Sequence, residues 1–293
     1  MDACEGCGGT VAPDGRCWEC GRAQAGFRAR VEITPVGGAA GVSDRGLVRE
    51  VNADAMAVRT SGPWTVGVAC DGVSMTPRSD RAALLAAEVG ASATAAGLSD
   101  GALPEVALSE GARAAGRAVA RLVPPGAAPG ETPPACTYVA AVVGPEGFWC
   151  AGIGDSRAYW IPDEGPGTLL TEDDTGADEA LTAWLGAGSG HADGGAGSGS
   201  AEGAGADAPL PRIRSLRTAV PGRLLLCTDG LWRHLPDLAA LRARLRPGGG
   251  EPLADARALV AHALGLGGAD NITAVVLSVP AAEPAADLPR TLA

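Results

Sequence analysis

Three aspartates lie at the boundaries of short apolar runs, where a β-sheet would expose them to water. They are Asp71, Asp229 and Asp270, within the segments VACDGVS, LLCTDGLW and DNITAVV. Short runs rich in Val, Leu and Cys are typical of buried strands, so the flanking residues are expected at the rim of the sheet. Several carboxylates at one rim repel each other unless a divalent cation lies among them, and all-oxygen ligands suit Mg²⁺ or Mn²⁺. The sequence therefore predicts a site for such ions.

A predicted hairpin would bring a fourth carboxylate, Asp54, beside Asp71. Asp54 precedes one strand, residues 61–63 supply a turn, and the returning strand ends at Asp71, so both acids lie at the open end. Asp270 begins its strand whereas Asp229 ends its own, so these two coincide if the strands are antiparallel neighbours. The alternative interpretation is that each Asp-Gly pair is an ordinary turn. The series taken together favours the metal site.

The eight cysteines fall into two sets. The first set forms CxxC, nine intervening residues and a second CxxC, which is the spacing of a zinc ribbon with four thiolates around one Zn²⁺. Disulfide pairing is the alternative, but the thiols of a chain without an export signal are expected to stay reduced. The second set lies inside apolar runs and is interpreted as small buried hydrophobes. The ribbon set is Cys4, Cys7, Cys17 and Cys20; the buried set is Cys70, Cys136, Cys150 and Cys227.

Composition limits the class of protein. The chain has 293 residues, 46% of them hydrophobic, and a net charge of -11. These values are typical of a globular protein, and the negative charge argues against nucleic acid as a partner. The N-terminus lacks a basic flank with a hydrophobic segment, and no apolar stretch is expected to span a bilayer, so no membrane partner is expected. A cytoplasmic location follows as an expectation.

Breaks in composition predict the organisation of the chain. The expected parts are a zinc ribbon at 1–22, a linker at 23–30, a main domain at 31–280 with a flexible Gly- and Ala-rich acidic loop at 186–211, and a disordered tail at 281–293. Expected strands are 31–36, 55–59, 64–70, 136–143, 147–153, 156–161, 223–228 and 272–279, with a further short strand at LTAWLG. Expected helices are 79–97, 103–122, 236–245 and 253–264. Strands and paired helices without strict alternation favour antiparallel sheet packed against helices.

The motifs together carry a family resemblance. In order they are SDRGLVREVNADA, VACDGVS, CTYVAAVV, GIGDSRAYWI, LLTEDDT, LLLCTDGLW and DNITAVVL. From residue 41 to residue 279 the chain resembles the metal-dependent protein phosphatases of the PP2C family, also called PPM. The resemblance implies an α+β fold, a four-layer α-β-β-α sandwich of two antiparallel sheets, with two Mn²⁺ or Mg²⁺ ions at one end. It also implies hydrolysis of phosphoserine and phosphothreonine in proteins by a metal-activated water.

The same resemblance assigns roles to residues of this sequence. Asp71 would bridge both ions, Gly72 would offer its carbonyl oxygen to one, and Asp229 and Asp270 would hold the other. Asp54 would act through a coordinated water, and Asp155 is the candidate ligand of a third ion. Arg49 would grip the substrate phosphate, because a guanidinium can pair with two oxygens at once; an ordinary surface arginine is the alternative. His234 is interpreted as structural rather than catalytic.

Three departures from the family pattern favour a second function. Ala53 stands where many members have a glutamate ligand, and Arg233 stands where relatives commonly have an aspartate that helps Asp155 bind the third ion. The flap inserted in relatives is reduced here to Gly176 to Ala180. The alternative function is therefore a weakened or inactive module that binds phosphoproteins or partners. A phosphatase of small molecules is a further, less favoured alternative.

Partners are expected from the same features. Phosphoproteins, a Ser/Thr kinase and its substrates are the expected partners, and a monomer is the expected state. The segment 163–207 has ten acidic residues and no arginine. It is interpreted as a solvated loop, or alternatively as a surface that selects phosphosites with basic flanks. The ribbon would either dock the enzyme on a partner or only brace the N-terminus.

Overall fold

The computed structural model describes residues 3–12, 15–24, 26–73, 76–123, 132–187, 209–245 and 250–281. Most of the predicted loop at 186–211, and all but the first residue of the predicted tail at 281–293, lie outside these residues. The predicted linker at 23–30 is described except for one residue.

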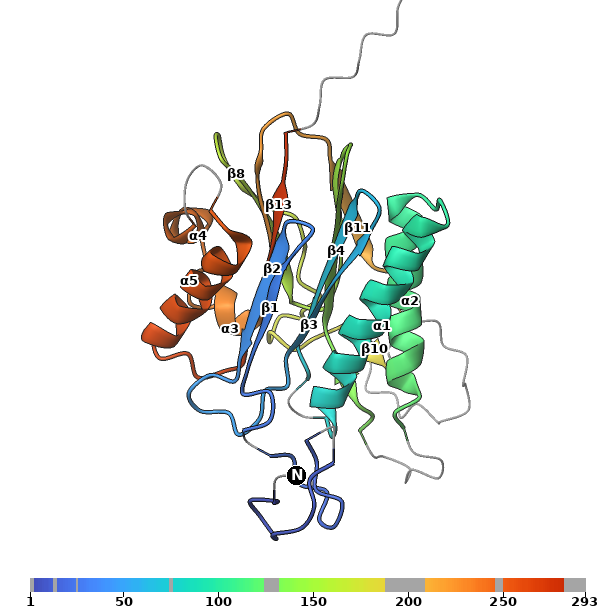
Figure 1. Cartoon of the computed structure of the whole chain (residues 1–293), viewed down its shortest axis with the longest axis vertical. Coiled ribbons are helices and arrows are strands. Elements are labelled where there is room, and N and C mark those ends of the chain that lie inside the picture. The colour runs from blue at the N-terminus through green and yellow to red at the C-terminus, as the bar shows by residue number, and fades with distance from the viewer. Residues whose placement is uncertain are drawn as a thin grey trace, which may run out of the picture.

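Two antiparallel sheets form the centre of the fold (Figure 1). The six-stranded sheet has the order β1 (Arg30–Val36), β2 (Ala39–Asp44), β13 (Ile272–Val279), β12 (Gly222–Cys227), β8 (Arg157–Pro162) and β9 (Thr168–Leu169). The five-stranded sheet has the order β11 (Arg212–Leu216), β7 (Gly147–Ile153), β6 (Tyr138–Gly144), β4 (Trp64–Cys70) and β3 (Ala55–Ser61). A further pair joins β10 (Leu185–Gly186) to β5 (Ala135–Cys136). The chain thus has the two antiparallel sheets that were predicted.

Helices cover both outer faces of the sheets, which gives the four expected layers. The helices α1 (Ser79–Ser99) and α2 (Pro104–Ala120) pack on the five-stranded sheet. The helices α3 (Asp229–Trp232), α4 (Leu238–Arg244) and α5 (Pro252–Gly265) pack on the six-stranded sheet. Figure 1 shows the two helical layers on opposite sides of the sandwich.

Apolar side chains fill all three spaces between these layers. Val139, Leu226 and Val275 lie in the middle layer, between the two sheets. Strands such as β6 are buried along their whole length, since both of their faces are covered, and this explains why they read as continuous apolar runs. Alanines of α1 and α2 let those helices lie close to the sheet.

Helix α1 is apolar and long enough to cross a membrane by length and composition alone. The sequence expectation that no apolar stretch reaches this span was therefore wrong for α1. In the structure the helix is packed against α2, β3 and β4, and its buried alanines and Leu98 belong to the core between helix and sheet. One such helix is weak evidence for a membrane span, because the core helix of a soluble protein passes the same test.

The predicted helices and most strands are confirmed, but several elements differ. Strand β2 was missed because the segment AAGVSD is small and almost fully buried, so it shows no alternation. Strand β11 was missed because it is polar and mostly exposed at the edge of its sheet. The predicted LTAWLG strand shrinks to β10, two residues long. Asp229 does not end a strand: β12 stops at Cys227 and Asp229 is the first residue of α3.

Candidate functional site

Strand pairing brings the predicted acids to one end of the sandwich. Ala55 of β3 pairs with Cys70 of β4, so Asp54 and Asp71 leave the five-stranded sheet side by side, as the hairpin predicted. Strands β12 and β13 are antiparallel neighbours, as predicted, and their pairing begins at Cys227 and Ala274. Asp229 and Asp270 therefore lie at the corresponding end of the six-stranded sheet.

Backbone contacts fix Asp71 and Gly72 in place. The N–H of Asp71 donates to Thr137 Oγ1 at 2.9 Å, and the N–H of Thr137 donates to the carbonyl oxygen of Asp71 at 2.8 Å. A Cβ on Gly72 would lie 2.6 Å from the carbonyl oxygen of Ser79 and 2.8 Å from that of Ala53. Only glycine fits between these two backbone oxygens. The position predicted to offer a carbonyl to a metal is thus a crowded, rigid point of the backbone.

Asp54 is the most deeply buried of the acids, with 2% of its surface exposed. Its Oδ2 accepts hydrogen bonds from the hydroxyls of Thr228 and Thr273, both at 2.8 Å. Its Oδ1 is buried and has no hydrogen-bond partner among the described residues. Burial, reinforced by the negative charges of Asp229 and Asp270, raises the pKa of Asp54 to about 7.

Neighbouring aspartates help to raise the pKa values of Asp54, Asp71 and Asp155. The pKa of Asp71 is raised well above its usual range, first by burial and then by the charges of other aspartates. Burial also raises the pKa of Asp155, in the turn between β7 and β8, to about 6, with a further contribution from Asp229. The aspartates that act on Asp71 are Asp54, Asp229, Asp155 and Asp270. The predicted carboxylates thus lie near enough for their charges to act on Asp71.

Two arginines pair with the outer carboxylates. Arg49 donates to both oxygens of Asp270, at 2.7 and 2.5 Å, rather than standing free for a phosphate. Arg233 donates from Nε to Asp229 Oδ2 at 2.9 Å and lies 3.7 Å from Glu179. Within the described residues no three carboxylate oxygens of separate acids come within 4.8 Å of one another. The arginines therefore hold positive charge where the family resemblance places metal ions.

The donor set fits hard divalent ions. Carboxylate and carbonyl oxygens are the ligands that Mg²⁺ and Mn²⁺ prefer. The buried and unpartnered Oδ1 of Asp54, and the raised pKa values of Asp54 and Asp71, are what a carboxylate cluster shows before cations neutralise it.

A second cluster lies in the N-terminal segment. One Sγ from each of four cysteines lies within 4.8 Å of the others, and they are Cys4, Cys7, Cys17 and Cys20. The N–H of Gly6 lowers the pKa of Cys4 to about 6, whereas burial raises that of Cys17 to about 12. Four thiolates suit tetrahedral Zn²⁺, which deprotonates its ligands on binding. The cluster is consistent with the predicted zinc ribbon.

A sequence model of the family described as "Protein phosphatase 2C" matches residues 47–258, most of the main domain. The chain belongs to the protein phosphatase 2C family. No curated protein matches the sequence. The match ends before Asp270, which lies just ahead of β13, so this predicted ligand is outside the matched region.

Solved structures of bacterial phosphatases share the fold. The serine/threonine phosphatase PstP/Ppp of Mycobacterium tuberculosis is 24% identical over 83% of this chain and 98% of that chain, with a TM-score of 0.58. The catalytic domain of PstP in complex with two manganese ions is 25% identical over 85% of this chain and 100% of that one, with a TM-score of 0.57. The phosphatase MsPP of Mycobacterium smegmatis, in complex with cacodylate, is 25% identical over 82% and 97%, with a TM-score of 0.59.

The structure shows the surroundings of the three positions that depart from the phosphatase 2C pattern. Ala53 offers only a methyl group, and its N–H donates to Asn271 Oδ1 at 2.8 Å. The short flap is a tight turn in which the N–H of Gly176 donates to the carbonyl oxygen of Ala180 at 2.8 Å. Glu179 in this turn faces Arg233, so the reduced flap contacts the site through one ion pair.

Sequence reasoning missed three polar residues that shape the phosphatase 2C site. Thr228 and Thr273 hold Asp54, and Asn271 binds the loop that carries Arg49. The Nδ2 of Asn271 donates to the carbonyl oxygens of Arg45 and Val51, at 2.8 and 3.0 Å. The signal was present, because Thr228 and Asn271 are next to predicted ligands in CTDG and DNIT, and Thr273 is three residues after Asp270.

The raised pKa of Asp54 predicts how stability changes with pH before Mn²⁺ or Mg²⁺ is added. An unfolded aspartate ionises near pH 4 and folded Asp54 near pH 7, so the folded state holds the extra proton between these values. Stability contributed by Asp54 is therefore present below pH 4 and lost as pH rises toward 7, by at most about 4 kcal/mol. Thermal melting of zinc-loaded, manganese-free protein should show this decline, and Asp54→Asn should make it shallower, with the raised pKa values of Asp71 and Asp155 supplying the remainder. An equal slope in both proteins would contradict the assignment.

Removing Arg233 should strengthen metal binding. Its guanidinium lies 2.9 Å from Asp229, and its charge partly offsets the rise in the pKa of Asp155, so it opposes a cation at either acid. We expect Arg233→Gln to tighten Mn²⁺ binding about 3- to 30-fold, since the pair is partly exposed and screened. Calorimetric titration with Mn²⁺ measures this, with Arg113→Gln on α2 as the matched control. Unchanged Mn²⁺ affinity in Arg233→Gln would contradict this prediction, because it would show that Arg233 does not compete with the ion for Asp229.

Proposed function

We propose that this phosphatase 2C chain hydrolyses phosphoserine and phosphothreonine in proteins. The convergence of Asp54, Asp71, Asp229 and Asp270 at one end of the sandwich supports this most directly. Membership of the phosphatase 2C family adds weight, as does a related catalytic domain that holds two manganese ions. The substrate class and the cytoplasmic location remain parts of the proposal.

In this proposal each residue keeps the role that the motifs suggested. Asp71 and the carbonyl oxygen of Gly72 would hold one ion, and Asp71, Asp229 and Asp270 the other, with Asp54 acting through water. When bound, two such ions supply an activated water and neutralise charge on the phosphoryl oxygens.

Arg49 has a specific task in binding the phosphate. It now forms a two-point ion pair with Asp270, and the same fork fits two phosphate oxygens. A cation held by Asp270 would satisfy the charge of this carboxylate without Arg49. The guanidinium would then be available to a phosphate monoester.

The test is release of inorganic phosphate from a phosphothreonine peptide by zinc-loaded protein, with and without added Mn²⁺. We expect saturable turnover that requires Mn²⁺. The second candidate, a phosphoprotein-binding module, is favoured by Ala53 and by Arg233 on Asp229. Peptide binding by calorimetry with no Mn²⁺-dependent turnover would favour that module and contradict the enzyme.

A further inference from the structure

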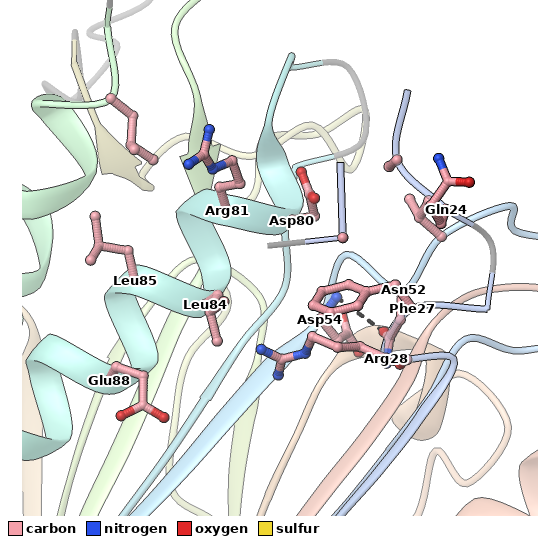
Figure 2. Close-up of a pocket in the computed structure, with 14 residues that line it drawn as sticks. Gln24, Phe27, Arg28, Asn52, Asp54, Asp80, Arg81, Leu84, Leu85 and Glu88 are labelled. Atoms are coloured by element: carbon pink, nitrogen blue, oxygen red, sulfur yellow. Dashed lines mark hydrogen bonds between the residues drawn. The ribbon is translucent and has the colours of Figure 1, made fainter. Parts of the chain in front are cut away.

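A cavity of about 260 Å³ lies where the ribbon and its connector meet the first helix (Figure 2). Gly15, Gln24 and Phe27 line it on the side of the ribbon and connector, and Leu84 and Leu85 line it on the side of α1. Its lining is mainly apolar, and its volume is near the lower end of small-molecule sites, roughly 300–1,000 Å³. A mainly apolar cavity with a few polar groups is the usual form of such a site.

Arg28 is the polar group that stands out in this cavity. Figure 2 shows its side chain reaching from the connector toward α1. The guanidinium donates no hydrogen bond and forms no salt bridge to any residue in the described part of the chain. Burial lowers its pKa, and only attraction across space from Glu88 and Asp80 opposes this. A half-buried cation of this kind favours an anionic ligand.

The backbone of Arg28 gives a second, independent indication. Its φ is 55°, in the left-handed region that residues other than glycine rarely adopt. Its carbonyl oxygen accepts a hydrogen bond from Nδ2 of Asn52 at 3.2 Å, which helps to hold this conformation. Strained backbone that surrounding contacts maintain is concentrated at binding sites.

Two of the three described acids that line the cavity pair with other arginines, and the third, Asp54, has one engaged oxygen and an Oδ1 without a partner in the described part of the chain. Asp80 pairs with Arg16 of the ribbon, and Glu88 pairs with Arg59 of β3. The Oδ2 of Asp54 accepts from two threonine hydroxyls. These contacts leave the positive charge of Arg28 without a close counter-ion among the described residues.

We propose that this cavity binds a compact amphipathic carboxylate. The carboxylate would form a two-point pair with Arg28, and the apolar body would lie between Phe27 and the two leucines of α1. The ligand would bridge the ribbon and the main domain, because its walls come from both. Asp54 lies at the edge of both this cavity and the candidate metal site, but binding of the carboxylate does not require phosphatase activity.

The test uses 3-phenylpropanoate as the probe, titrated by calorimetry into zinc-loaded, manganese-free full-length protein. We expect saturable binding of one probe per chain with a Kd below about 1 mM. The neutral 3-phenylpropanamide should bind about 10- to 100-fold more weakly, since it lacks the charge that pairs with Arg28. Hydrogen exchange should slow in residues 26–29 when the probe is bound.

Variants of Arg28 and Arg49 test where the probe binds. Arg28→Met should reduce affinity for the carboxylate to that for the amide, and Arg28→Lys should fall between them. Arg49→Met, which removes the exposed arginine beside Asp270, should leave binding unchanged. Equal affinity for carboxylate and amide, loss of binding only in Arg49→Met, or no saturable binding would each overturn the proposal. The comparison of carboxylate with amide needs no variant, so it holds even if Arg28→Met folds poorly.

Discussion

Replacing Asp71 with asparagine should reduce Mn²⁺-dependent phosphate release by at least about 1,000-fold, equivalent to about 4 kcal/mol of transition-state stabilisation. Asp71 is the acid on which the charges of four other aspartates converge, and its backbone is fixed by Thr137. Asparagine keeps the shape of the side chain but removes the charge that attracts both ions. Initial rates on a phosphothreonine peptide at saturating Mn²⁺ measure the effect.

The same variant should be at least as stable as the wild type without Mn²⁺ or Mg²⁺. Burial and neighbouring charges disfavour ionised Asp71, so neutral asparagine removes an unfavourable charge. Thermal melting then separates lost chemistry from lost fold. Asp163→Asn, at an exposed aspartate between β8 and β9, is the matched control and should keep full activity. Residual Mn²⁺-dependent activity above one tenth in Asp71→Asn would contradict its assigned role.

Removing two ribbon thiols should abolish zinc binding. Cys7→Ser with Cys20→Ser takes one thiolate from each CxxC pair, so the bound zinc should fall from one ion per chain to none. Structural zinc contributes about 10–16 kcal/mol to the folding of such small units, and residues 3–24 have little core of their own. Elemental analysis and backbone NMR of the ribbon should both report the loss.

The main domain should remain folded in this double variant, since its three apolar layers do not include the ribbon. Trp18→Ala is the control within the ribbon. Its side chain is 72% exposed between two of the cysteines, and its removal leaves all four thiols in place. Zinc retained in the double variant, or lost in Trp18→Ala, would contradict a four-thiolate site.

The sequence by itself was sufficient where local spacing carries the information. Two CxxC pairs predict a zinc ribbon because each short turn can present two thiolates to one ion. Aspartates at the boundaries of apolar runs predicted a common site; the pairing of β3 with β4 and of β12 with β13 aligns the acids within each sheet, and the hydrogen bonds from Thr228 and Thr273 to Asp54 bring the two sheet ends together. Two of the strands that escaped prediction, β2 and β11, lack the alternation on which such a prediction depends.

Only the tertiary structure decided which charges meet. Arg49 and Asp270 are 221 residues apart in sequence, and Thr273 and Asp54 are 219 apart. No periodicity links such pairs, because their distance depends on how two sheets pack and on which loop crosses their end. The approach of the ribbon to α1 through Arg16 and Asp80, and the cavity beside Arg28, have the same origin. The sequence determined the chemical groups, and packing between distant segments determined which of them neutralise one another.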